Sequence, residues 1–145
     1  MNRNTNGKTA ELRSIGRSVL ALFAGFATGI VLSLGTDLGL HAVGLWPSLD
    51  QPMSGQLLVF ATVYRTIYGI IAAYIVARLA PYRPLGHALI GGAIGTVVSI
   101  AGAAVTWNRG LGPHWYAIAL IFVALPSAWV GGRLRLTQLG RQAIV

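Results

Sequence analysis

The sequence of 145 residues contains no cysteine and only three acidic residues, and charged residues make up 10% of it. Without cysteine, neither a disulfide framework nor a thiolate metal site can form. The charged fraction is less than half of the roughly 25% found in soluble domains. Because 54% of the residues are hydrophobic, the composition also argues against a disordered chain. The length fits a single domain.

The sequence does contain many basic and many apolar residues. Eleven Lys and Arg residues give a net charge of +8 at pH 7, which on an apolar chain is typical of a nucleic-acid binder or a membrane protein. Four long stretches almost free of charge favour the membrane, because about 20 helical residues span a hydrocarbon core of ~30 Å. The sequence therefore predicts an all-α, four-helix transmembrane bundle, with helices at roughly 18–43, 56–79, 86–107 and 114–132.

The basic residues are distributed unevenly along this pattern. Four lie in 1–17, two flank the turn between the second and third helices, and three lie in 133–145, whereas Arg109 is the one basic residue of the opposite loops. The positive-inside rule therefore predicts that both termini are cytoplasmic. The segments 1–17 and 133–145 are expected to be short, polar, basic tails on a membrane domain over 18–132. Charge dispersed in this way forms no basic stripe, so nucleic acid is not an expected partner.

Small residues recur at every fourth position of the first and third helices, around Gly25 and Gly29 and around Gly91 and Gly95. Such stripes let helix backbones approach closely in lipid, although glycine is also common in membrane helices for no specific reason. They favour a contact between the first and third helices, or an interface between copies of the chain. Pro126 lies within the fourth helix and cannot donate a backbone hydrogen bond, so a kink is expected there.

Arg65 lies well inside the second apolar stretch, where an arginine costs about 2.5–3.5 kcal/mol to insert. It lies ~15 Å from the outer end of its helix at 1.5 Å per residue, too deep for easy snorkelling, so an acidic partner is expected. Glu11 and Asp50 lie outside the predicted helices, and Asp37 is the remaining acid. Because its predicted depth matches that of Arg65, the sequence predicts a buried Asp37–Arg65 pair.

Further polar residues gather in the same outer half of the predicted bundle, so that every helix contributes to one cluster around the pair. This supporting cluster consists of His41, Tyr64, Tyr68, Trp107, Asn108 and His114. His41 follows Asp37 by one helical turn and is expected on the same face.

Several functions fit such a cluster. The pair can simply lock two helices together, in a small multi-pass protein of structural or accessory type. Alternatively, Asp37, His41 and Arg65 can serve proton, ion or small-solute transport in an oligomer, since intramembrane ionisable groups are functional candidates. Arg65 can also bind an anionic ligand or lipid headgroup, and His41 or His114 can act as the base of an outer-leaflet enzyme. A metal site at Asp37, His41 and His114 lacks a recognised spacing. No metal or cofactor is expected, and no catalytic motif is present.

Short motifs spread over about residues 20–135 resemble those of a group of small, uncharacterised bacterial integral membrane proteins. The motifs are Gly35-Thr36-Asp37 with His41, Tyr64-Arg65 with Tyr68-Gly69, Thr106-Trp107, Gly112-Pro113-His114-Trp115-Tyr116, and Leu125-Pro126 with Trp129, Gly131 and Gly132. The resemblance implies a four-helix protein of the bacterial inner membrane. It implies no substrate, and the expected partners are the lipid bilayer and a second copy or another membrane protein.

Overall fold

The computed structural model describes residues 3–47, 51–110 and 112–142, with side chains from Glu11 onward, and every regular element in these residues is an α-helix. The four helices are α1 (Arg3–Ala42), α2 (Gly55–Leu79), α3 (Pro84–Thr106) and α4 (His114–Gln142). The predicted all-α, four-helix architecture is therefore confirmed. Each helix has the length and mean hydropathy of a membrane span, and the chain is a multi-pass membrane protein.

Local sequence signals explain where α2 and α3 begin. The Ser54 side chain accepts a hydrogen bond from the Leu57 amide and caps α2, as a serine N-cap does. Pro84 opens α3, where its missing N–H would have no helical partner in any case. The preceding Arg83 has a φ of 42°, a left-handed conformation that reverses the chain within a short turn between α2 and α3.

Two helices are longer than the sequence indicated. Helix α1 has 40 residues and begins at Arg3 rather than near 18, and α4 has 29 residues and ends at Gln142 rather than near 132. The basic segments expected as tails are thus helical extensions of the spans over their described residues. The prediction placed the helix ends where apolar character stops. A polar composition does not break the backbone hydrogen bonds that define a helix.

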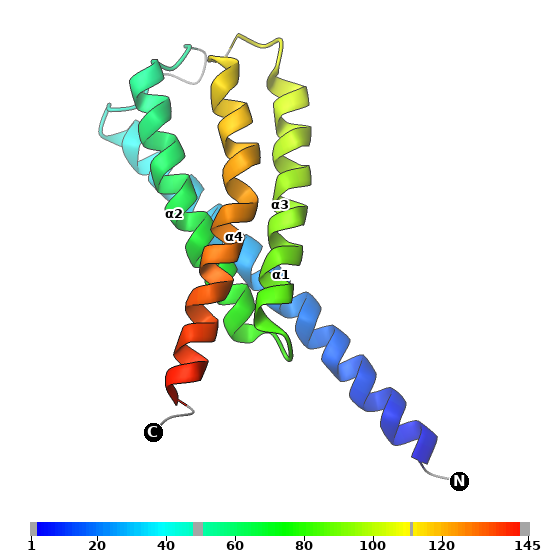
Figure 1. The fold of residues 1–145 in the computed structure, drawn as a ribbon. Helices are drawn as coiled ribbons and strands as arrows, with labels where there is room; N and C mark the ends of the chain where they lie inside the picture. The colour runs from blue at the N-terminus through cyan, green and yellow to red at the C-terminus, as the bar shows by residue number, and fades with distance from the viewer. Residues whose placement is uncertain (1–2, 48–50, 111, 143–145) are drawn as a thin grey trace.

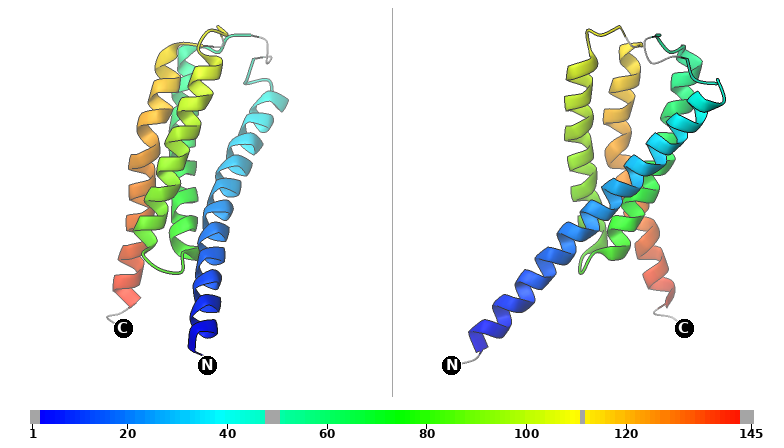
Figure 2. Two further views of the ribbon diagram at one scale, coloured as in Figure 1. Left: turned by 90° about the vertical axis from the view of Figure 1, so that its right-hand side faces the viewer. Right: turned by 180° about the vertical axis from the view of Figure 1, so that it is seen from behind.

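Helices α2, α3 and α4 lie side by side, whereas α1 crosses them at an angle and its N-terminal part extends away from the bundle (Figures 1 and 2). The α1–α2 and α3–α4 connections lie at one end, and the α2–α3 turn and both chain termini lie at the other (Figure 1). This arrangement places Asp37 of α1 and Arg65 of α2 toward the end that carries the α1–α2 and α3–α4 connections. We call it the connection end, and the opposite end the terminal end.

Glycine and alanine form the closest contacts in the half of the bundle near the terminal end. A Cβ on Gly131 of α4 would lie 2.8 Å from the amide nitrogen of Tyr74, in α2. A Cβ on Gly132 would lie 3.0 Å from the Cβ of Ala88, in α3. A buried cluster joins the same three helices, and its members are Ala73, Ala77, Ala88 and Ala128. Close approach of backbones at small residues is how helices pack in lipid.

The glycines singled out from the sequence are placed differently from expectation. Gly25 and Gly29 face α2 rather than α3, and a Cβ on Gly25 would lie 2.9 Å from the carbonyl oxygen of Ala72. Gly91 does approach α1, through Leu22, but a Cβ on Gly95 would have no neighbouring atom within 4 Å. Helices α1 and α3 are therefore in contact as predicted, through Gly91 and Leu22 and through the bond between His87 and Ser18. The two stripes do not face each other, however, because the stripe of α1 faces α2. An interface between copies of the chain stays a prediction. Pro126 lies inside α4, and the kink there stays a prediction.

Large apolar side chains cover the outside of the bundle. Phe23 and Val31 of α1, Val97 of α3 and Phe122 of α4 are between 65% and 72% exposed. In water such a surface would aggregate, but hydrocarbon chains solvate it. The outward apolar surface and the small-residue core are therefore consistent features of one membrane-embedded fold.

Candidate functional site

The pair predicted from the sequence is present in the structure and joins α1 to α2. Nη2 of Arg65 donates to Oδ2 of Asp37 at 2.6 Å, and this is a salt bridge. Oδ1 of the same carboxylate accepts a hydrogen bond from the hydroxyl of Tyr64. The side chains of Arg65 and Asp37 are 33% and 21% exposed. Each oxygen of Asp37 thus has a donor, as a partly buried charge requires.

A second polar contact lies next to the pair on the same two helices. The hydroxyls of Thr36 and Tyr68 are 2.7 Å apart, and either one can donate. The rings of Tyr64 and Tyr68, one helical turn apart, have centroids separated by 5.5 Å. The predicted supporting cluster does not include Thr36, although this residue directly precedes Asp37 in the sequence. Together Thr36, Asp37, Tyr64, Arg65 and Tyr68 form a polar seam between α1 and α2.

Aromatic side chains close the seam toward the connection end. Trp46 is only 6% exposed and packs with Ala61 and Tyr64. Its ring meets Phe60 edge-on, with centroids 6.4 Å apart. Trp46 is buried because the chain folds back after α1, where the amides of Leu45 and Trp46 both bond to the Leu40 carbonyl. This apolar cover lowers the local polarity around the Asp37–Arg65 pair and strengthens the interaction.

The three histidines and Asn108 lie in separate parts of the structure. Nδ1 of His41 bonds to the backbone carbonyl oxygen of Asp37 at 2.8 Å, so this ring is bound to the main chain rather than to the carboxylate. His114 stacks on Trp107, with centroids 4.2 Å apart, and its Nε2 lies 3.0 Å from the Trp107 carbonyl oxygen. Asn108 is exposed in the turn after α3. His87, which the cluster did not include, bonds to the hydroxyl of Ser18 at 2.9 Å near the terminal end.

Metal coordination has no support in this arrangement. Among the residues that the structure describes, no group of three or more histidine or carboxylate side chains is placed to hold a metal ion. Asp37, His41 and His114, the set considered from the sequence, do not converge, since each makes the different contacts described above.

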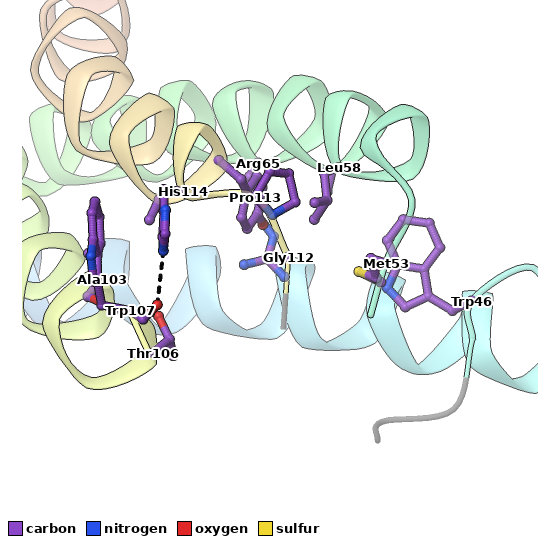
Figure 3. A pocket seen from close by; sticks show the side chains of 13 residues that line it. Trp46, Met53, Leu58, Arg65, Ala103, Thr106, Trp107, Gly112, Pro113 and His114 are labelled. Carbon is purple, nitrogen blue, oxygen red and sulfur yellow. Dashed lines mark hydrogen bonds between the residues drawn. The ribbon is translucent and has the colours of Figure 1, made fainter. Parts of the chain in front are cut away.

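A cavity of about 240 Å³ lies beside Arg65, between α2, α3 and α4 at the connection end (Figure 3). We call it the outer cleft. Its lining consists of Trp46, Met53, Leu58, Ala61, Arg65, Ala103, Thr106, Trp107, Gly112, Pro113, His114, Tyr116 and Ala117. The predicted residues Arg65, Trp107 and His114 therefore meet in one place. Tyr68 and Asn108 do not line it.

Comparisons with protein-family models, with curated proteins and with solved structures found no match to this chain. The similarity of its short motifs to those of small bacterial membrane proteins therefore stays a prediction. The site itself defines only the general class, a four-helix multi-pass membrane protein that has a polar seam and a cleft in the same half of the bundle.

Proposed function

We propose that the protein is a structural or accessory component of the bacterial inner membrane, in which the polar seam fastens α1 to the rest of the bundle. As an accessory protein it acts with a second copy or with another membrane protein. The observation that carries the proposal is that both carboxylate oxygens of Asp37, in α1, are bound by residues of α2. The donors are Tyr64 and Arg65, and breaking such a pair by removing one partner is strongly destabilising.

The packing in the half of the bundle near the terminal end supports a structural role rather than transport through a single chain. Between the polar seam and His87, the described parts of the four helices contain no carboxylate or imidazole group. Instead, this half contains the cluster of Ala73, Ala77, Ala88 and Ala128 and the tight backbone contact at Gly131. Proton and ion pathways in membranes are lined by ionisable groups or water-filled cavities, and closely packed alanine and glycine supply neither.

A flux measurement tests this proposal directly. The purified protein is reconstituted into liposomes that contain a trapped pH-sensitive dye, and a potassium gradient with valinomycin sets the membrane potential. We expect the rate of proton entry to equal that of protein-free liposomes. Proton entry above that rate, abolished by Asp37→Asn but not by the matched lipid-facing variant Val97→Ala, would contradict the structural role and favour transport.

The orientation is a separate part of the proposal. Both termini lie at the same end of the bundle, and nine of the eleven basic residues of the sequence lie in the terminal segments or at the α2–α3 turn. We infer that this end is cytoplasmic, because cytoplasmic segments are enriched in Lys and Arg. The outer cleft then lies in the periplasmic half.

Reporter fusions measure this orientation. A fluorescent protein that matures only in the cytoplasm, fused after Val145, is expected to fluoresce, and alkaline phosphatase at the same position is expected to be inactive. The same two reporters inserted after Arg109, in the α3–α4 connection, are expected to give the reverse result. Active phosphatase at the C-terminus would reverse the assigned topology.

A further inference from the structure

The outer cleft contains a charged donor that the polar seam does not fully use. Arg65 pairs with Asp37 through Nη2, yet its side chain also lines the cleft. Its side chain is 33% exposed, and among the described residues Asp37 is the one hydrogen-bond acceptor of the guanidinium. A guanidinium has five N–H donors, and the bond to Asp37 uses one of them. The guanidinium is therefore able to serve a second acceptor while it keeps Asp37.

The lining of the cleft restricts what that acceptor can be. Among the lining residues that the structure describes, Arg65 is the only one with a permanent charge, and none of them is a carboxylate. The hydroxyl of Thr106 donates to the Gly102 carbonyl of its own helix, and Nε2 of His114 faces the carbonyl oxygen of Trp107. Apart from the hydroxyl of Tyr116, the described side chains of the walls contain no group that competes for this cationic donor. Such a site favours an anion over a cation.

The remaining walls are apolar and aromatic, and they set the size and character of the ligand. Trp46, Trp107 and Tyr116 contribute rings, while Leu58 and Pro113 contribute aliphatic surface. The volume of about 240 Å³ is at or below the lower end of small-molecule sites, which begin at roughly 300 Å³. The cleft therefore suits a compact anionic group with a short apolar part rather than a large polar metabolite.

We propose that the outer cleft binds the phosphate or carboxylate group of a small amphiphilic anion through Arg65, with the apolar part of that anion against the aromatic walls. The polar seam holds the guanidinium in place for this purpose, since Asp37 binds one edge of it and is itself held by the hydroxyl of Tyr64. A donor that is already oriented loses less entropy on binding. The anion is either a free acid or the headgroup of a lipid, and the two sources share the same recognition chemistry.

The binding test uses the native tryptophans, because Trp46 and Trp107 line the cleft. The full-length protein, in an uncharged maltoside detergent, is titrated with hexyl phosphate, hexanoate, dihexanoyl phosphatidylglycerol and hexanol. We expect saturable changes in tryptophan fluorescence with anionic compounds and none with hexanol. Binding of the free anions indicates a soluble ligand, whereas binding of the phosphatidylglycerol alone indicates a lipid headgroup, and either result supports the site. Absence of saturable binding by every anion, or equal binding of hexanol, overturns it.

Variants at Ala103 and Ala104 locate the site without changing the polar seam. Ala103 lines the cleft and is 8% exposed, whereas the adjacent Ala104 is exposed on the outside of α3. We expect Ala103→Leu to fill the cleft and weaken anion binding at least about tenfold, or 1.4 kcal/mol, and Ala104→Leu to leave it unchanged. Arg65→Lys keeps the charge but removes the planar fork and is expected to weaken binding as well. Unchanged affinity in Ala103→Leu contradicts the proposal, even if Arg65→Lys fails to fold.

Discussion

Replacing Gly131 by alanine is expected to destabilise the bundle more than any other single-methyl addition at the glycines discussed above. A Cβ at this position would overlap the carbonyl oxygen of Ile70 and lie 2.8 Å from both the Cβ of Ala73 and the amide nitrogen of Tyr74. These neighbours include the backbone of α2, which cannot rotate away as a flexible side chain does. Helices α2 and α4 must therefore separate, and the contacts along their shared face weaken together.

The expected size follows from two opposing effects. Overpacking a close contact costs about 1–3 kcal/mol and occasionally more, while replacing Gly by Ala inside a helix gains about 1 kcal/mol of helix propensity. Because the clash involves backbone, we expect a net loss of about 2 kcal/mol for Gly131→Ala, and we expect Gly131→Leu not to fold. Unfolding in mixed maltoside and dodecyl sulfate micelles, followed by far-ultraviolet circular dichroism, measures this free energy.

Gly95 provides the matched control. It lies in α3, and a Cβ added to it would meet no neighbouring atom within 4 Å, so Gly95→Ala keeps the propensity gain without the clash. We expect it to be neutral or slightly stabilising. If Gly95→Ala and Gly131→Ala have the same effect, then the contact between α2 and α4 at Gly131 is not as close as the structure has it.

Removing the carboxylate of Asp37 is expected to have the second large effect. Asp37→Ala leaves Arg65 without its ionic partner, and Tyr64 without its acceptor. Breaking a buried pair by removing one member costs about 3–5 kcal/mol, because the remaining charge is uncompensated. An ordinary hydrogen bond between membrane helices contributes only about 0.6 kcal/mol. We therefore expect a loss of about 3 kcal/mol for Asp37→Ala in the same unfolding measurement.

The double variant distinguishes an ionic effect from a loss of packing. Replacing a buried pair by apolar residues is often close to neutral, so Asp37→Ala combined with Arg65→Leu should be more stable than Asp37→Ala alone. His41→Ala is the control on the same helix. We expect it to lower the free energy of unfolding by less than about 1 kcal/mol, because the His41 ring bonds only to a backbone carbonyl. Strictly additive losses in the double variant would show that the two charges do not interact.

The number of spans could be predicted from the sequence alone, because span length and apolar composition are local properties that lipid imposes on each helix separately. The pairing of Asp37 with Arg65 could be predicted as well. Only one acid lies within an apolar stretch, so a buried arginine had one candidate to pair with. The ends of α1 and α4 were harder to predict from the sequence, since helical hydrogen bonding continues into the basic segments beyond the apolar part of each helix.

Which faces of the helices meet depends instead on tertiary packing. A glycine stripe shows that close approach is possible, but the position of α1 across the bundle decides that Gly25 faces α2, and Gly131 approaches the backbone of α2 although it belongs to neither stripe. The outer cleft also depends on how α2 packs against α3 and α4. Such features arise from the relative position of whole helices, which no local pattern encodes.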